Sequence, residues 1–214
     1  MALVPSLARL LLDAVAPLRC AGCDSVSSTA ICAACVERVG EQGGLSPLGL
    51  GWGTAHAAFA FEAEVREILH GGKFQGNRAG LRHIAQLAAR RLELPHRPPP
   101  DAIAAVPLGA GRRRQRGYNQ AEIVAAVFAT VVGRPMLGGL VRTRETAPQS
   151  SRGEEARQAN VAGAFAWRGP ELRGAALWLV DDVLTTGATL GAAASVLRDA
   201  GAQQVDALVI ARVP

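Results

Sequence analysis

Two adjacent acids, Asp181 and Asp182, precede a short segment rich in hydroxyl groups, Thr-Thr-Gly-Ala-Thr at 185–189. If this segment begins a helix, its unpaired backbone N–H groups attract a phosphate, and Gly187 lets the backbone approach that phosphate closely. Carboxylates repel a phosphate, but they accept hydrogen bonds from vicinal sugar hydroxyls, directly or through hydrated Mg2+. We therefore expect a ligand with a phosphate at one end and a ribose diol in its middle. The plain alternative, an acidic turn followed by a threonine N-cap, accounts for Thr189 alone.

All four cysteines lie in one short window, as two C-x2-C pairs at Cys20 and Cys23 and at Cys32 and Cys35. Each pair can direct two thiolates at one ion, and two pairs complete the tetrahedron that Zn2+ accepts. The alternatives are two disulfides or a redox-active pair. The chain shows no export signal, and the segment is too small for a redox scaffold. We predict a structural zinc site, in which four sulfur ligands leave no position open for catalysis.

Strands and helices that can position these groups alternate after the proline-rich segment at 95–100, which is the clearest internal boundary. Strands separated by helices indicate a parallel α/β sheet, and ligands bind at the carboxyl ends of its strands. Residues 64–70 favour a helical turn that breaks at Gly71 and Gly72 and leaves Lys73 in an exposed basic loop. Strands are expected at 57–61, 102–108, 136–141, 175–180 and 205–213, and helices at 80–94, 119–132 and 189–200.

The composition excludes global disorder and a membrane-spanning chain. Of the 214 residues, 49% are hydrophobic, and no apolar run reaches the ~18 residues of a membrane helix. The first residues lack the basic region of a signal peptide and favour an amphipathic helix at 7–15. We expect a cytoplasmic protein, and such a helix can also contact the inner face of the plasma membrane. The formal net charge of +5 permits anionic ligands or nucleic acid without choosing between them.

The stretch from Trp178 to Thr189 resembles the 5-phosphoribosyl-1-pyrophosphate (PRPP) loop of type I phosphoribosyltransferases. This resemblance implies an α/β fold with a type I phosphoribosyltransferase-like parallel sheet flanked by helices. It also implies that Asp181 and Asp182 lie beside the ribose hydroxyls, together with Mg2+. The residues that would hold the 5′-phosphate are Val183, Leu184, Thr185, Thr186, Gly187, Ala188 and Thr189.

Further motifs follow the order found in the ComF family, which includes GntX-like proteins. Besides the cysteine segment they are GGKFQGN at 71–77, VPLGAGRRRQRGYNQAE at 106–122, RTRETAPQ at 142–149 and RQANVAGAF at 157–165. The resemblance spans nearly the whole chain. It implies a PRPP-binding phosphoribosyltransferase linked to DNA uptake in natural transformation, with an acceptor that the sequence does not name. Its implied partners are single-stranded DNA and uptake machinery such as a ComFA-type helicase. The alternative is a non-catalytic accessory that binds single-stranded DNA or senses PRPP through a retained phosphate pocket.

We expect three parts in the chain, divided after the cysteine segment and at the proline-rich boundary. Residues 1–45 form the N-terminal helix and the four-cysteine zinc finger, and residues 46–100 form a connector and a hood-like segment. Residues 101–214 form the phosphoribosyltransferase-like domain.

Four arginines, Arg112, Arg113, Arg114 and Arg116, follow the first strand of this domain. They can bind the pyrophosphate of PRPP and stabilise charge on the departing group. The family resemblance implies that Arg116 and the turn at 106–108 lie near that site, with residues 118–120 beside them. On this basis we expect Arg116 to act in catalysis, and Pro107, Arg114 and Lys73 to contact PRPP. A solvated basic face and a nucleic-acid patch are the alternatives, although stacking on single strands needs aromatic residues that this segment lacks apart from Tyr118.

A polar segment of about twenty residues separates the second and third core strands, and loops of this length are commonly functional lids. In type I phosphoribosyltransferases a mobile loop closes over PRPP at this place. The residues that match the family pattern in this loop are Arg142, Gln149, Arg157 and Asn160. A plain solvated loop is the alternative.

Overall fold

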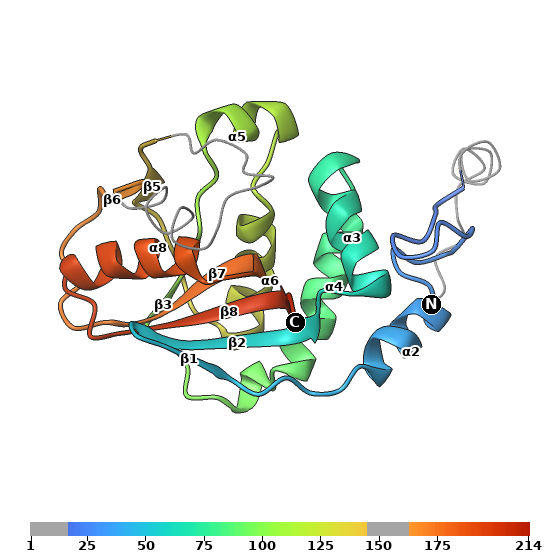
Figure 1. Cartoon of the computed structure of the whole chain (residues 1–214), viewed down its shortest axis with the longest axis horizontal. Coiled ribbons are helices and arrows are strands. Elements are labelled where there is room, and N and C mark those ends of the chain that lie inside the picture. The colour runs from blue at the N-terminus through green and yellow to red at the C-terminus, as the bar shows by residue number, and fades with distance from the viewer. Residues whose placement is uncertain (1–16, 145–162) are drawn as a thin grey trace, which may run out of the picture.

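The computed structural model describes residues 17–144 and 163–214, and a six-stranded sheet forms their centre (Figure 1). The strand order is β1-β2-β8-β7-β3-β4, in which β1 is antiparallel to β2 and the other neighbours are parallel. The six strands are β1 (Leu48–Leu50), β2 (Gly53–Ala60), β3 (Ala102–Ala105), β4 (Met136–Leu137), β7 (Ala176–Leu184) and β8 (Gln204–Arg212). A separate antiparallel pair consists of β5 (Leu140–Arg142) and β6 (Phe165–Trp167).

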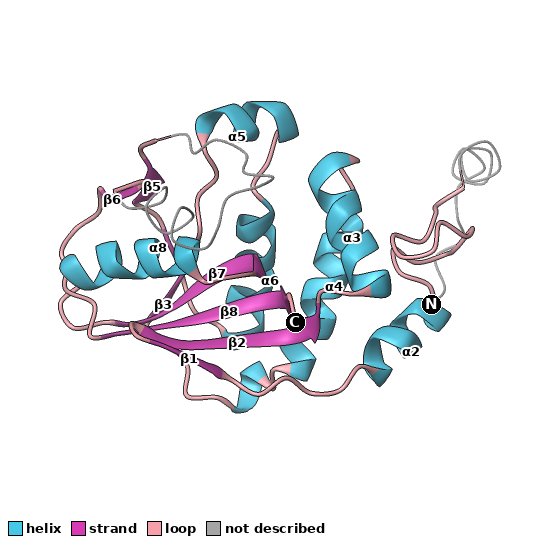
Figure 2. Ribbon diagram, viewed as in Figure 1, coloured by secondary structure: helices cyan, strands magenta, loops and turns pink. Residues whose placement is uncertain are grey.

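Helices cover both faces of the sheet (Figure 2). The helices are α2 (Ala33–Glu41), α3 (Ala63–Phe74), α4 (Arg78–Arg91), α5 (Ala110–Arg116), α6 (Gln120–Val132) and α8 (Ala188–Asp199), with a 3-10 turn at Leu94–His96. Helix α8 packs on one face, where Leu190 and Leu197 meet Leu179 of β7. Helices α3, α4 and α6 pack on the other, where Phe128 belongs to the same core as Val180. The predicted α/β architecture, a parallel sheet flanked by helices, is confirmed.

Strand β7 is longer than the sequence pattern predicted. The expected strand at 175–180 ended before the two acids, because charged residues are rare inside a buried strand. The structure continues the parallel ladder with β8 through Asp181 and Val183 to Leu184. Both acids therefore lie within the last part of the strand, and the hydroxyl-rich segment follows directly.

The expected strand at 136–141 is also corrected, because it is two strands that belong to different sheets. Residues Met136 and Leu137 pair with β3, whereas Leu140 to Arg142 pair with β6. Gly138 and Gly139 separate the two strands, so the chain leaves the main sheet at this point. Arg142 is carried toward the carboxyl ends of the main strands by this change of direction.

Helix α3 runs through Gly71 and Gly72 without the expected break and ends only at Phe74. Both glycines are buried inside this helix. A Cβ on Gly72 would lie 2.5 Å from the side chain of Leu81 in α4. The close approach of α3 and α4, and not a turn, therefore explains Gly72. Lys73 lies in the helix and not in an exposed loop.

The segment at 17–41 packs against the outer end of α3. Ile31, Cys35 and Val39 belong to the same buried core as Val65 and Ile68 of α3. The guanidinium of Arg38 also pairs with the carboxylate of Glu64 in the first turn of α3. Figure 1 shows this segment beside α3, on the side away from α8. The helix expected at 7–15 lies outside the described residues.

Replacing Gly72 by alanine should lower the free energy of unfolding by about 1–3 kcal/mol, since the added methyl overlaps a fully buried Leu81. Gly71→Ala is the matched control. Its Cβ would meet its nearest atom at 3.5 Å, and alanine is the better helix former by up to about 1 kcal/mol. Denaturant titration measures both variants. Equal stability of the two would contradict the close-approach explanation.

Candidate functional site

The two acids of β7 sit at the carboxyl edge of the sheet but point in different directions. Successive side chains of a strand alternate between faces, so Asp182 follows Val180 toward α3, and Asp181 follows Leu179 toward α8. Both still border one cavity, because the strand ends only two residues beyond them. The side chain of Asp181 also accepts a hydrogen bond from the backbone N–H of Asp182, at 2.8 Å.

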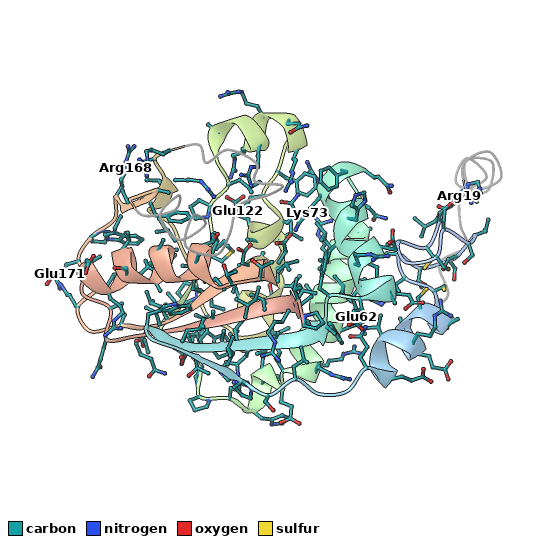
Figure 3. The ribbon with its side chains drawn as sticks, viewed as in Figure 1. Arg19, Glu62, Lys73, Glu122, Arg168 and Glu171 are labelled. Carbon is teal, nitrogen blue, oxygen red and sulfur yellow. The ribbon has the colours of Figure 1, made fainter. Side chains whose placement is uncertain are left out.

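Lys73 brings a cation to this edge from α3 (Figure 3). Its Nζ lies 2.9 Å from Oδ2 of Asp182, a carboxylate that is 8% exposed as a residue. A buried carboxylate needs a partner of this kind, since an unpaired buried charge is costly. The sequence predicted Lys73 for the site but gave no reason to pair it with Asp182.

The arginine cluster forms the short helix α5. Gly117 ends this helix, and Asn119 then caps α6, accepting from the N–H of Ala121 at 3.1 Å. The amide of Asn119 also donates to the carbonyl of Val106 at 2.9 Å, so the start of α6 is tied to the turn after β3. This bond places the arginine helix beside the carboxyl end of the sheet.

A cavity of about 220 Å³ lies where these elements meet. Its charged lining combines two carboxylates with four cationic side chains, which come from α3, α5, β5 and β7. The lining residues are Lys73, Val106, Pro107, Leu108, Arg112, Arg116, Asn119, Gln120, Ala121, Arg142, Asp181, Asp182 and Thr189. Of the residues predicted from sequence, Lys73, Pro107, Arg116, Arg142, Asp181, Asp182 and Thr189 are therefore gathered in one place.

The segment at 185–189 begins α8, as expected for a phosphate-binding turn. Gly187 takes a left-handed conformation, with φ of 79°, immediately before the helix. Thr189 lies in the first turn and faces the charged cavity. Thr186, Gly187 and Ala188 border a second cavity, of about 650 Å³, which runs along α8 toward Trp52. The segment thus separates two cavities. Val183 and Leu184 belong to β7, and the side chain of Leu184 is buried in the core.

Several predicted residues lie elsewhere. Arg114 is exposed on α5 and does not line the charged cavity. Arg113 pairs with Glu122 of α6, with 2.6 Å between Nη1 and Oε1. Gln149, Arg157 and Asn160, three of the four residues assigned to the mobile loop, fall outside the described residues.

Two further residues contribute to these cavities: Gln120, which the family resemblance implied beside the site, and Trp52, which was not singled out from the sequence. Gln120 accepts a hydrogen bond from Arg116 at 3.1 Å, which fixes that guanidinium at the cavity wall. Trp52 lies in a glycine-rich stretch that was interpreted as a connector, and no sequence signal indicated that β1 and β2 would carry it to α8.

The two acids differ in electrostatic environment. Burial first, and then the charge of Asp182, raise the pKa of Asp181 to about 7. The hydrogen bond from the backbone N–H of Asp182, and then the charges of Lys73 and Arg142, oppose this rise in pKa. Asp181 therefore changes its protonation state near neutral pH, while Asp182 is ion-paired with Lys73.

The sulfur atoms of Cys20, Cys23, Cys32 and Cys35 all lie within 4.8 Å of one another. The Sγ atoms of Cys23 and Cys32 are 3.7 Å apart, close to the ~3.8 Å edge of a tetrahedron with metal–sulfur bonds of ~2.3 Å. All four cysteines are free in the structure, which forms neither of the two disulfides considered above. The residues thus fit one tetrahedrally bound metal ion.

Among residues 17–144 and 163–214, every helix is too short or too polar to cross a bilayer.

Removing the ionisable group at 181 should change how stability depends on pH. In the wild type the folded-state pKa of Asp181 lies above its ordinary value. The contribution of this group to the free energy of unfolding is therefore fully present near pH 4 and is lost as the pH rises through about 7. Asp181→Asn keeps the acceptor oxygen but cannot ionise. Its free energy of unfolding should match the wild type at pH 4 and exceed it by roughly 1–4 kcal/mol at pH 8.

Denaturant titrations at the two pH values measure this difference. Asp199→Asn, which removes an exposed carboxylate from α8, is the control. A gain for Asp181→Asn that is equal at both pH values would contradict the prediction.

Loss of one thiolate should release the metal and loosen the segment at 17–41. Cys35 is fully buried and shares the core of α3, so Cys35→Ser should lower the melting temperature by several degrees and abolish stoichiometric metal binding. Ser28→Ala, an exposed change in the same segment, should alter neither. Elemental analysis and thermal denaturation give the two readouts. Full metal content in Cys35→Ser would show that Cys35 is not a ligand.

Comparison with known proteins identifies the domain to which this site belongs. Residues 70–214 match the family model described as "Phosphoribosyl transferase domain". The chain is 34% identical to "Competence protein F" of Haemophilus influenzae, over 53% of this chain and 51% of that protein. It is likewise 34% identical to "DNA utilization protein YhgH" of Salmonella typhi, over 54% of this chain and 51% of that protein. The chain spans about half the length of these curated relatives.

Among solved structures, adenine phosphoribosyltransferase from Thermoanaerobacter pseudethanolicus aligns with a TM-score of 0.41 and 16% identity, over 81% of this chain and 84% of that chain. The resemblance to ComF-family proteins is confirmed over about half the chain by the relative named Competence protein F. The family model covers more than half of the chain, including every described residue of the charged cavity. The chain belongs to the phosphoribosyl transferase domain family.

Proposed function

We propose that the charged cavity binds PRPP with Mg2+. The observation that carries this proposal is the meeting of Asp181, Asp182, Lys73 and Arg116 in one cavity, at the edge of the sheet where α8 begins. Backbone N–H groups of the first turn of α8 take the 5′-phosphate, and the hydroxyls of Thr185, Thr186 and Thr189 add donors. The acids bind the ribose hydroxyls, directly or through Mg2+.

The pyrophosphate of PRPP lies against the cationic wall in this proposal. Lys73, Arg112, Arg116 and Arg142 surround the same cavity from three elements. Arginine suits an oxygen-rich anion because its guanidinium donates in a planar fork, whereas Lys73 supplies a compact point charge. Such a wall stabilises negative charge on a departing pyrophosphate.

The reaction that fits this geometry is the transfer of a phosphoribosyl group. A nucleophile attacks C1 of the ribose, the bond from C1 to the pyrophosphate oxygen breaks, and the pyrophosphate leaves with the electron pair. Positioning and charge stabilisation account for the rate, without a dedicated general base. The acceptor is not assigned, so the activity is a glycosyltransferase reaction in class only.

A role in handling imported DNA is supported by the relatives named Competence protein F and DNA utilization protein YhgH. Under this proposal the protein works in the cytoplasm, at the inner face of the plasma membrane, beside a helicase of the uptake machinery. The metal of the cysteine cluster is zinc, because four thiolates in a closed tetrahedron suit a structural zinc site.

The second candidate function, binding of single-stranded DNA, gains support from an aromatic residue that the sequence did not connect to the arginines. Phe74 is 63% exposed at the end of α3, and the guanidinium of Arg116 lies 5.3 Å from its ring centre. Arg113 and Arg114 are exposed on the adjacent helix α5. An exposed ring beside arginines is a combination on which bases can stack.

Asp182→Asn should weaken Mg2+-dependent binding of PRPP at least tenfold, because it removes the charge that faces the ribose and Mg2+ and leaves Lys73 without its carboxylate. Isothermal titration calorimetry measures the dissociation constant. Asp199→Asn, an exposed acid at the far end of α8, should bind PRPP as the wild type does.

PRPP binding that is equally tight in Asp182→Asn and the wild type would contradict the proposed PRPP site. A wild-type protein that binds no PRPP would contradict it as well. In that case, affinity for single-stranded DNA that falls steeply with salt would favour the second. Binding of PRPP without release of pyrophosphate across many acceptors would indicate a sensor instead of a transferase.

A further inference from the structure

The backbone carbonyl of Gly72 receives two side-chain donors from the opposite wall of the site. The hydroxyl of Tyr118 donates to it, and Nε2 of Gln120 donates to it at 3.1 Å. Gly72 lies in the last turn of α3, where carbonyl groups lack a partner within the helix. These bonds therefore join the end of α3 to the turn that follows the arginine helix.

The residue after this carbonyl is Lys73, whose ammonium reaches Asp182 at 2.9 Å. The side chain of lysine is long and flexible, so the direction in which it leaves the backbone decides whether the ammonium can meet a fixed carboxylate. A bond to the preceding carbonyl fixes the peptide group from which Lys73 departs. We call the hydrogen bond from Tyr118 to the carbonyl of Gly72 the latch. The latch holds Gly72 and the ion pair holds Lys73, which are neighbouring residues of one helical turn.

Tyr118 is itself held in place. It is 9% exposed, and the guanidinium of Arg78 lies 4.4 Å from the centre of its ring. Burial raises the pKa of Tyr118 above its ordinary value, so the hydroxyl remains a donor at neutral pH. Gln120 keeps one bond to Gly72 if the hydroxyl is removed, so a phenylalanine at 118 leaves no buried carbonyl without a partner.

We propose that Tyr118 is a positioning residue: through the carbonyl of Gly72, its hydroxyl holds Lys73 on Asp182 at the carboxyl edge of the sheet. The positioning of Lys73 by Tyr118 depends only on the contacts described above. The expectation that this positioning favours PRPP binding rests on the proposed function. One measurement tests the positioning of Lys73, and a second tests its effect on PRPP binding.

The first measurement uses the fact that Lys73 is the only lysine of the chain. An amine-reactive acetyl ester modifies a free amine faster than one held by a carboxylate. Mass spectrometry of digested protein follows Lys73, with the α-amino group of the chain as internal reference. We expect Tyr118→Phe to raise the modification rate of Lys73 roughly fivefold, as for a lost hydrogen bond. Asp182→Asn, which removes the ion-pair partner, should raise it at least as much.

Thr130→Ala is the matched control, since it removes a hydroxyl from α6 that donates to the carbonyl of Ala126 at 2.9 Å, far along the helix from Tyr118. It should leave the rate unchanged. A wild-type rate in Tyr118→Phe, with a raised rate in Asp182→Asn, would overturn the proposal. A wild-type rate in both would overturn it too, because Asp182 would then not hold Lys73. Melting temperatures within about 4 °C of the wild type would exclude general loosening as the cause.

The second measurement is a double-mutant cycle on binding of Mg2+-PRPP. Tyr118→Phe should raise the dissociation constant roughly fivefold in the wild-type background and have no further effect in a Lys73→Met background. A merely structural role for Tyr118 predicts additive effects, and additivity would overturn action through Lys73. If the wild type binds no PRPP, the proposed function fails, while the labelling result still decides the role of Tyr118.

Discussion

A carboxylate that is almost fully enclosed has to be neutralised, and the pairing of Asp182 with Lys73 is the constraint around which the site is arranged. Asp182 lies within β7 between Asp181 and Val183, which both pair with β8, so its backbone cannot move toward a partner. The partner must therefore be brought to it, and α3 does this on the face of the sheet toward which Asp182 points. Everything that fixes α3 then also fixes the charge balance of the cavity, since breaking such a pair by removing one partner costs several kcal/mol.

Helix α3 is fixed at several points along its length. Its outer end packs on the cysteine segment, where Cys35 joins the same core as Val65. Its last turn touches α4 so closely that Gly72 has no space for a side chain beyond hydrogen. Its inner end is bonded to Tyr118. The cysteine segment, which contributes no residue to the described lining of the cavity, is thus packed against the helix that carries Lys73.

The sequence predicted those parts of the site that depend on neighbours along the chain. The cysteine pairs and the turn before α8 carry their chemistry in fixed local spacing, and both are found where they were expected. The pair of Lys73 with Asp182 joins residues far apart in the chain, so no local pattern could reveal it. The break predicted at Gly71 and Gly72 was wrong, because glycine occurs both in turns and where one helix closely approaches another. Phe74 was not predicted as a binding residue, because its contact with Arg116 of α5 is visible only in the folded structure.

The two acids were treated as an equivalent pair, whereas the structure gives them different properties. Alternation along β7 sends Asp182 to the face that carries Lys73, and Asp181 to the face of α8. The pKa of Asp181 is raised to about 7, so near neutral pH this side chain is able both to donate and to accept a hydrogen bond. A sugar diol needs partners of both kinds, and a divalent ion bound at the same place favours the ionised form. Under the proposed function, the same carboxylate therefore binds the ribose in its protonated state and the Mg2+-bound ribose in its ionised state, without a change in its position.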